Sequence, residues 1–232
     1  MGNKVFASAA QAIEDIPDGA TVMVGGFGLC GIPENLIRAL VKRGVRNLHT
    51  LANDMAVPGA GLSLLLECGS ISEHTASYVG GNPLLADLMF SGKLKVNLMP
   101  QGNFAESIRA AGAGIPAFFT PAGVGTSVSE GRELRRFGER AYMLQEALSA
   151  DFALVKAWRG DTKGNLVYRK TARNFNPMMA TAAKITIAEV EELVEPGQLD
   201  GDHIVTPGIY VKRILQGGLY ERRVDKLRFR QA

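Results

Sequence analysis

Three glycines in the segment Gly26-Phe27-Gly28-Leu29-Cys30-Gly31 have the spacing G-x-G-x-x-G, and they follow a short apolar run. That spacing is typical of loops that carry a strand into a helix close to a bound phosphate. A dinucleotide-binding loop also needs an acidic residue about 20 positions later, and Asp54 nearly satisfies this requirement. Pro33, however, delays the helix and removes one N–H group that would hold a pyrophosphate. The residues alone leave open a nicotinamide enzyme, another phosphate-handling loop and a plain turn.

Cys30 is the nucleophilic side chain of this loop. It lies shortly before an expected helix N-terminus, where the thiolate form is favoured. A catalytic thiol also needs a positioned base, and the three histidines, His49, His74 and His203, are scattered along the chain. We therefore expect Cys30 to be a buried structural thiol.

The carboxylates form no pair with the pattern of a general acid and a general base. Glu106 follows Asn103 by three residues, which predicts a helix-capping box. Glu73 and Glu130 lie in polar turns. Three further glutamates are expected on the solvated side of an element near the end of the sheet: Glu189, Glu191 and Glu192. We assign no acid–base residue in this chain.

Gln101 and Gly102 follow an expected strand at residues 93–99. Open α/β sheets bind ligands at the carboxyl ends of their strands. An uncharged amide there can bind a carboxylate or thioester oxygen without acting as a nucleophile. The alternative is a turn glutamine that makes local hydrogen bonds.

The elements that must position these residues follow a strand–loop–helix–strand order, which predicts an α/β fold with a parallel sheet. The expected strands are residues 21–24, 48–52, 71–79, 93–99, 152–157, 165–169 and 185–190, the last closing the sheet region. Expected helical segments are residues 7–16, 33–43, 62–66, 84–90 and one that Asn103 caps, and a hairpin is expected within 133–148 around Gly138. We expect one domain, residues 1–232, with three layers: an open, mostly parallel sheet and helices on both faces.

Composition excludes several classes of function. A net charge of +3 is too small to indicate nucleic-acid binding, and the basic residues within 212–230 are expected to be solvated or to face another subunit. Two cysteines provide neither a disulfide framework nor a metal site. The N-terminus lacks a signal peptide, and no apolar run reaches the roughly 18 residues that cross a bilayer. A cytoplasmic protein that contacts no membrane is expected.

Several segments together resemble the family I coenzyme A (CoA) transferases, specifically the alpha (A) subunit of the two-subunit 3-oxoacid CoA-transferases. The first is "DGATVMVGGFGLCGIP" at residues 18–33. It is followed in the same order by "MPQGNFAESIRAAGAGIPAFFTPAGVGT", "KAWRGDTKGNLVYRKTARNFNP", "ITIAEVEELVEPG" and "HIVTPGIYVKRI". The resemblance covers nearly the whole chain and is far more specific than G-x-G-x-x-G.

The resemblance implies a CoA-transferase-like fold and covalent, ping-pong catalysis by a glutamate of a partner B subunit. The family's glutamate lies in a Ser-Glu-Asn-Gly motif that this chain lacks, so the chain is expected to be active only with the B subunit, in an A2B2 or larger assembly. The implied CoA-binding residues are Gly25, Gly26, Phe27, Gly28, Leu29, Cys30 and Gly31. The implied substrate-binding residues are Asn53, Asp54, Gln101 and Gly102. No metal or cofactor is implied, because CoA is itself a substrate.

The acid substrate stays open between a succinyl-CoA type and an acetate or butyrate type, with a 3-oxoacid such as acetoacetate as the other partner. Succinyl-CoA-using subunits usually have Asn-Asn-Cys-Gly where this chain has Asn53-Asp54-Met55-Ala56, whereas the loop at Gly28 is of the succinyl type. An Asp54 carboxylate in the pocket would repel the second charge of a dicarboxylate. The alternative functions are a nicotinamide-dinucleotide enzyme that uses Gly26, Gly28 and Gly31, and a non-catalytic ligand-binding α/β domain.

Overall fold

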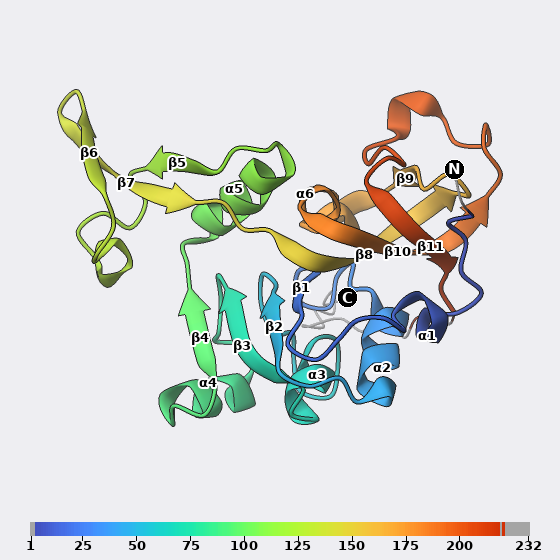
Figure 1. The fold of residues 1–232 in the computed structure, drawn as a ribbon, viewed down its shortest axis with the longest axis horizontal. Coiled ribbons are helices and arrows are strands. Elements are labelled where there is room, and N and C mark those ends of the chain that lie inside the picture. Colours follow the sequence, from blue (N-terminus) through green and yellow to red (C-terminus); the bar gives the residue numbers. More distant parts are fainter. Residues whose placement is uncertain (1–2, 219, 221–232) are drawn as a thin grey trace, which may run out of the picture.

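The computed structural model describes residues 3–218 and 220. Within them, eight strands form one sheet in the order β11-β10-β8-β1-β2-β3-β4, with β9 paired to β8. Neighbours along this order are parallel, and β9 is antiparallel to β8. The strands are β1 (Thr21–Val24), β2 (Leu48–Leu51), β3 (Ile71–Ala76), β4 (Lys95–Leu98), β8 (Ala150–Asp161), β9 (Leu166–Val167), β10 (Ala183–Val194) and β11 (Val211–Gln216). The predicted, mostly parallel sheet is confirmed (Figure 1).

Helices cover both faces of this sheet. They are α1 (Ala9–Ala12), α2 (Glu34–Arg43), α3 (Ser63–Glu67), α4 (Pro83–Phe90), α5 (Gln101–Gly112) and α6 (Asn176–Thr181), with short 3-10 helices η1 (Ser127–Ser129), η2 (Lys170–Arg173) and η3 (Gly201–His203). Strand β1 shows this arrangement, because its successive side chains point to opposite faces of the sheet. Val22 belongs to one apolar cluster together with Leu36 of α2, and Met23 belongs to a second apolar cluster together with Phe104 of α5. A strand buried on both sides in this way is read as a continuous apolar run.

A second, antiparallel sheet projects from the body beyond α5 (Figure 1). It contains β5 (Ala117–Thr120), β6 (Leu134–Phe137) and β7 (Arg140–Glu146) in the order β5-β7-β6. The predicted hairpin is present, and Gly138 has the positive φ of 61° that the turn between β6 and β7 uses. The composition of residues 112–126 did not reveal β5, because its four residues lie within a glycine-rich segment.

Several predicted boundaries are wrong. The first helix is only α1, capped by the Ser8 hydroxyl, and the expected strand at 165–169 is the two-residue β9. The expected last strand is β10, which is twice as long as predicted and is not the edge of the sheet. Strand β11 pairs with β10 over residues 186–190 and closes the sheet instead. Most of the basic tail lies outside the described residues.

The predicted capping box at Asn103 and Glu106 is also wrong. Helix α5 begins at Gln101 after an N-cap at Pro100, three residues before the cap predicted at Asn103. The Asn103 side chain is buried, where Nδ2 donates to the Ala122 carbonyl and Oδ1 accepts from the Thr120 hydroxyl. Glu106 instead pairs with Arg109 one turn along the helix, at 2.6 Å. Asn103 therefore fastens α5 to the connection after β5 rather than ending the helix.

Among the described residues, no helix combines the length and the apolar character that a membrane span requires. In the same part of the chain, no three His, Cys, Asp or Glu side chains are grouped so that they could hold a metal ion.

Candidate functional site

The glycine loop connects the carboxyl end of β1 to α2. Its centre is a tight turn in which Phe27 and Cys30 exchange two backbone hydrogen bonds, at 3.0 and 2.9 Å. At two positions of the loop, residues from outside the loop leave no room for a side chain. A Cβ at Gly25 would collide with the Asn176 amide, and a Cβ at Gly31 would lie 2.5 Å from the Ala172 carbonyl oxygen. The loop is therefore packed closely against residues 172–176.

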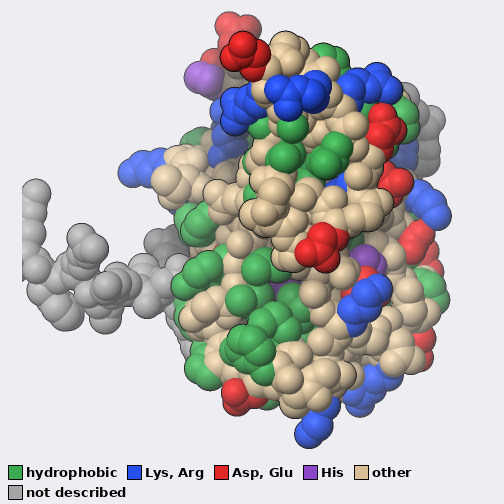
Figure 2. Space-filling view, turned by 90° about the vertical axis from the view of Figure 1, so that its left-hand side faces the viewer, with side chains coloured by type: hydrophobic (Ala, Val, Ile, Leu, Met, Phe, Trp, Pro, Cys, Tyr) green, Lys and Arg blue, Asp and Glu red, His purple; other side chains and the backbone are tan. Residues whose placement is uncertain are grey.

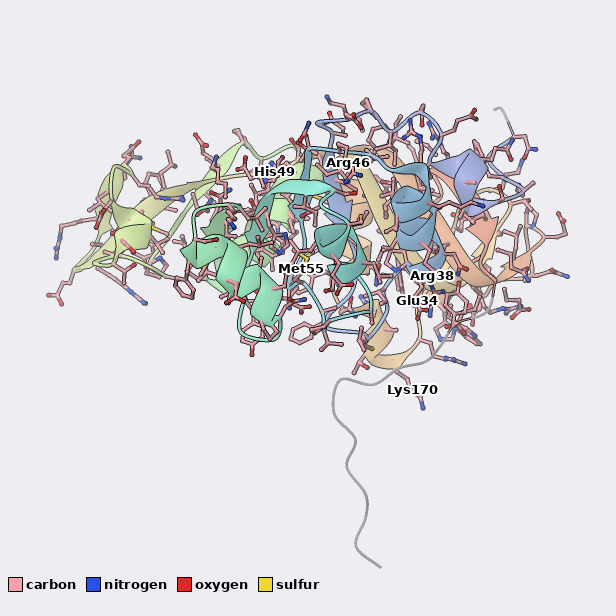
Figure 3. The ribbon with its side chains drawn as sticks, turned by 90° about the horizontal axis from the view of Figure 1, so that it is seen from below. Glu34, Arg38, Arg46, His49, Met55 and Lys170 are labelled. Atoms are coloured by element: carbon pink, nitrogen blue, oxygen red, sulfur yellow. The ribbon has the colours of Figure 1, made fainter. Side chains whose placement is uncertain are left out.

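Two asparagines of this supporting segment hold the loop by its carbonyl groups. Asn174 Nδ2 donates to the Cys30 carbonyl at 2.9 Å, and Asn176 Nδ2 donates to the Gly31 carbonyl at 2.9 Å. The Asn176 side chain is fully buried, and its Oδ1 accepts from the backbone N–H of Lys156. Lys170, at the start of η2, points away from the body (Figure 3). The segment thus supports the back of the glycine loop.

The N-terminus of α2 is occupied by a glutamate of this chain. Glu189 in β10 is 0% exposed, and its carboxyl group accepts from the backbone N–H groups of Asn35 and Leu36 at 3.3 and 2.9 Å. Burial raises the pKa of Glu189, and these donors oppose that shift. The prediction that Glu189 is solvated is wrong. The other two N–H groups of the first turn donate to nearby carbonyl oxygens, so this turn has no donor left for a phosphate.

Asp54, just beyond β2, connects the glycine loop to its neighbours. Its Oδ2 accepts from the Gly28 N–H at 2.9 Å and from Asn53 Nδ2 at 2.7 Å, and its Oδ1 accepts from the Ala56 N–H at 2.8 Å. Asn53 is buried, and its Oδ1 accepts from Gln101 Nε2 at 2.8 Å. Four sequence-predicted residues from three different connections therefore form one hydrogen-bonded network at the carboxyl ends of the strands.

A cavity of 320 Å³ opens beside this network. Phe27, Gly28, Asp54, Met55 and Tyr78 are among the residues that line it, and Asp54 is the one charged residue of the described lining. Gln101 and Gly102 do not line this cavity, and Cys30 faces a different one. Of the predicted residues, Phe27, Gly28 and Asp54 therefore line the cavity, and Asn53 and Gln101 belong to the network behind it. Other predicted residues are not among the described lining residues: Gly25, Gly26, Leu29, Gly31 and Gly102.

A larger cavity, of 650 Å³, lies between the sheet and the projecting hairpin. His49, Thr75 and Asn97 contribute to its floor, and none of the sequence-predicted site residues line it. Figure 3 shows His49 well apart from Met55, which lines the smaller cavity. We take the smaller cavity as the candidate site because it lies beside the loop and the strand ends.

Cys30 has no histidine as a partner. Its Sγ lies 3.5 Å from the Thr171 hydroxyl, whereas His49 contacts Thr75 and His74 contacts Thr50. The thiol is partly exposed rather than buried, so that part of the prediction is wrong. Nothing in this arrangement supplies the base that a catalytic thiol needs.

His74 in β3 is a buried neutral base. Its Nδ1 lies 2.9 Å from the Thr50 hydroxyl, its Nε2 has no hydrogen-bond partner, and burial lowers its pKa to about 4. The unfolded imidazole has a pKa of about 6.5, so below that pH the unfolded chain binds a proton that the folded chain does not. The depressed pKa therefore makes stability fall as the pH decreases from 6.5 towards 4.

We expect the free energy of unfolding to fall by about 2 kcal/mol between pH 7 and pH 4.5 through His74 alone. Urea unfolding of the wild type and His74→Gln at both pH values measures this, and the variant should show the smaller pH dependence. His203→Gln is the matched control, because His203 is exposed beside Asp200. Equal pH dependence in wild type and His74→Gln would contradict the prediction.

The sequence did not indicate the capping role of Glu189, and it did not single out Asn174, Asn176 or Tyr78. A glutamate within a strand that is apolar on both sides is one signal that could have identified Glu189, since such a group needs internal donors. The asparagines gave no comparable signal, because their partners are backbone groups far away in the chain.

Comparisons with known proteins agree with these observations. The family model described as coenzyme A transferase matches residues 6–217. The chain is 52% identical over 229 residues to a protein of Bacillus subtilis (strain 168). That protein is named as the A subunit of a probable succinyl-CoA:3-ketoacid coenzyme A transferase. The match covers 99% of this chain and 96% of that protein. It is 49% identical over 230 residues to the A subunit of the Helicobacter pylori (strain J99) succinyl-CoA:3-ketoacid coenzyme A transferase, with 99% of each chain covered.

A solved structure is also similar to this fold. The acyl-CoA transferase of Escherichia coli O157:H7, in its thioester complex with CoA, superposes with a TM-score of 0.82 at 24% identity. The match covers 93% of this chain and 47% of that chain. At this identity the similarity concerns the fold alone.

Proposed function

The chain belongs to the coenzyme A transferase family, and from this premise we propose that it is the A subunit of an enzyme that moves CoA between an acyl-CoA and a 3-oxoacid. Succinyl-CoA and acetoacetate are the substrates we propose, because the Bacillus and Helicobacter relatives are named succinyl-CoA:3-ketoacid transferases over nearly their whole length. Transfer from succinyl-CoA to acetoacetate by the chain mixed with a B subunit is the assay that tests this.

The observation that carries the proposal is the cavity beside the glycine loop, whose one acidic residue in the described lining is already engaged. Both Asp54 oxygens accept hydrogen bonds, from Gly28, Asn53 and Ala56, and the carboxylate holds the loop in place. A carboxylate fixed by three donors is a poor nucleophile, because attack would break these hydrogen bonds. The attacking carboxylate is therefore supplied by the B subunit.

The proposed chemistry is covalent and proceeds in two matched halves. A glutamate carboxylate, provided by the B subunit, attacks the thioester carbonyl, the C–S bond breaks, and CoA leaves as a thiolate from an acyl-glutamyl anhydride. The thiolate then attacks the glutamyl carbonyl, which releases the first acid as its carboxylate and leaves a glutamyl-CoA thioester. The second acid reverses both steps.

This chain's own contribution is to position the acyl-CoA. Gly28 presents backbone to the cavity without a side chain in the way, and the proposed CoA-binding residues extend from Gly25 to Gly31. The apolar wall at Met55 suits the uncharged part of an acyl-CoA. Asn53 and Gln101, hydrogen-bonded behind Asp54, hold the substrate side of the site in place, and Gly102 follows in the first turn of α5.

The α2 N-terminus is not part of this proposal. Its first-turn N–H groups are used by Glu189 and by neighbouring carbonyls, so the phosphates of CoA are bound elsewhere. The same observation disfavours a nicotinamide dinucleotide, whose pyrophosphate needs these groups. No other feature of the described residues favours that alternative.

Asp54→Asn tests which acid the cavity prefers. The amide keeps one acceptor oxygen and turns its NH2 towards an N–H donor, so kcat/KM should fall for every acid. Removal of the charge should partly restore kcat/KM for succinate only, because only succinate carries a second negative charge. Two charges about 5 Å apart at an effective dielectric of 20 repel by about 3 kcal/mol before solvent screening. We expect the succinate-to-acetate ratio of kcat/KM to rise by about tenfold.

The measurement compares both acids as acceptors with acetoacetyl-CoA in the assembled enzyme. Asp87→Asn on α4 is the control, because Asp87 is exposed and does not line the cavity. An unchanged ratio would mean that Asp54 does not select the acid.

A further inference from the structure

Two large aromatic side chains stand exposed where the candidate cavity opens. Phe27 is 49% exposed and Tyr78 is 55% exposed, and both belong to the cavity lining. They come from different connections, Phe27 from the glycine loop and Tyr78 from the segment between β3 and α4. Exposed aromatic residues around a concave site are typical of protein interfaces.

Tyr78 packs close to a pair of glycines although it is exposed. Its side chain lies beside Gly80 and Gly81. A Cβ atom added at Gly80 would be 3.0 Å from the phenolic oxygen of Tyr78, and one added at Gly81 would be 3.4 Å from its ring. The two glycines therefore leave the space beside the backbone that the ring occupies. A side chain that already packs against the backbone on one side has fewer conformations to lose when a partner covers its other side.

The cavity is incomplete in this chain. It offers no free carboxylate among its described lining residues, because Asp54 is engaged by three donors. A reacting carboxylate supplied from outside has to enter through the opening beside Phe27 and Tyr78. The part of the lining that the structure describes contains no cation, so the contacts that this opening can offer a partner around the entering group are mainly apolar.

We propose that Tyr78, packed against Gly80 and Gly81 beside Phe27, is the anchor on which the partner subunit of the transferase docks and closes the cavity. This inference rests on the proposed function, because it takes the occupant to be the B subunit. It adds the surface of this chain that the B subunit covers and the residue on which the affinity depends. Aromatic residues held at the centre of an interface commonly contribute most of its binding energy.

Other exposed aromatic residues do not have this position. Phe90 is 84% exposed at the far end of α4, about 12 Å along the helix from the cavity side. Phe137 lies on the projecting hairpin and already packs edge-on against Phe119 and Tyr142. Figure 2 shows hydrophobic side chains gathered on the lower half of the side that carries β4 and α4, so exposure alone does not identify the interface.

The test measures the Kd between this chain and a B subunit for the wild type, Tyr78→Ser, Phe90→Ser and Phe137→Ser. We expect Tyr78→Ser to weaken binding by at least about tenfold and the other two by less than about twofold. Tyr78 is half exposed, so its replacement should leave thermal unfolding of the isolated chain nearly unchanged, which confirms that each variant is folded. Turnover of the wild-type pair is measured separately.

The outcomes separate the two proposals. Wild-type turnover together with unchanged binding by Tyr78→Ser would overturn the docking surface and leave the function standing. Tight, Tyr78-dependent binding without turnover would support the docking surface and contradict the function. A homodimer of this chain that Tyr78→Ser dissociates would show that the face joins two copies, and the inference would be wrong.

Discussion

The purified chain by itself is expected to transfer no CoA, and turnover should appear when a B subunit is added. The reason is chemical, because Asp54, the acidic residue of the described cavity lining, is hydrogen-bonded at both oxygens to the loop it supports. Without a nucleophile, the rate should fall by at least about 10⁴-fold. The measurement follows consumption of acetoacetyl-CoA with succinate as acceptor, with and without the partner.

The matched control is a B subunit whose Ser-Glu-Asn-Gly glutamate is replaced by glutamine. It should still bind this chain, since the change preserves shape, but the pair should be inactive. Substantial turnover by this chain alone, or by the pair with the glutamine variant, would show that the nucleophile is not where we place it.

Gly28→Val is expected to damage CoA use far more than folding. Gly28 has a φ of 56°, its N–H donates to Asp54 at 2.9 Å, and it lines the cavity. A β-branched side chain disfavours that backbone conformation by about 1–2 kcal/mol and also occupies the space of the substrate. We expect kcat/KM for the acyl-CoA to fall at least about a hundredfold, through both the displaced loop and the blocked approach.

Gly44→Val separates strain from function in this experiment. Gly44 ends α2 with a φ of 74°, and a Cβ there would meet nothing within 4 Å. The two variants should therefore lose similar stability in urea unfolding, while only Gly28→Val should lose kcat/KM. Equal kinetics in both variants would mean that the glycine loop is only a turn.

The parallel sheet and the glycine loop could be predicted because their signals are local. The apolar run of β1, the glycines after it and the Gly44 stop of α2 lie within 25 successive residues, and each acts through its own backbone preferences. The substrate-side residues Asn53 and Gln101 were found only by resemblance or by their position after a strand. The structure joins them through a 2.8 Å hydrogen bond across 48 positions.

The sequence by itself determined the α/β order from β1 to α5, the family and the absence of a Ser-Glu-Asn-Gly motif, since these depend on residues near one another in the chain, whereas β5 and β11 were not predicted. Only the tertiary structure decided what each polar group does. Glu189 caps α2 from 153 positions away, and Asn176 holds the Gly31 carbonyl across 145 positions. A buried polar group must find its partner wherever the fold places one, and single-residue patterns carry no information about that partner. The same principle applies to α5, which begins at Gln101. The Asn103 side chain does not cap this helix, because it forms hydrogen bonds with Thr120 and Ala122 instead.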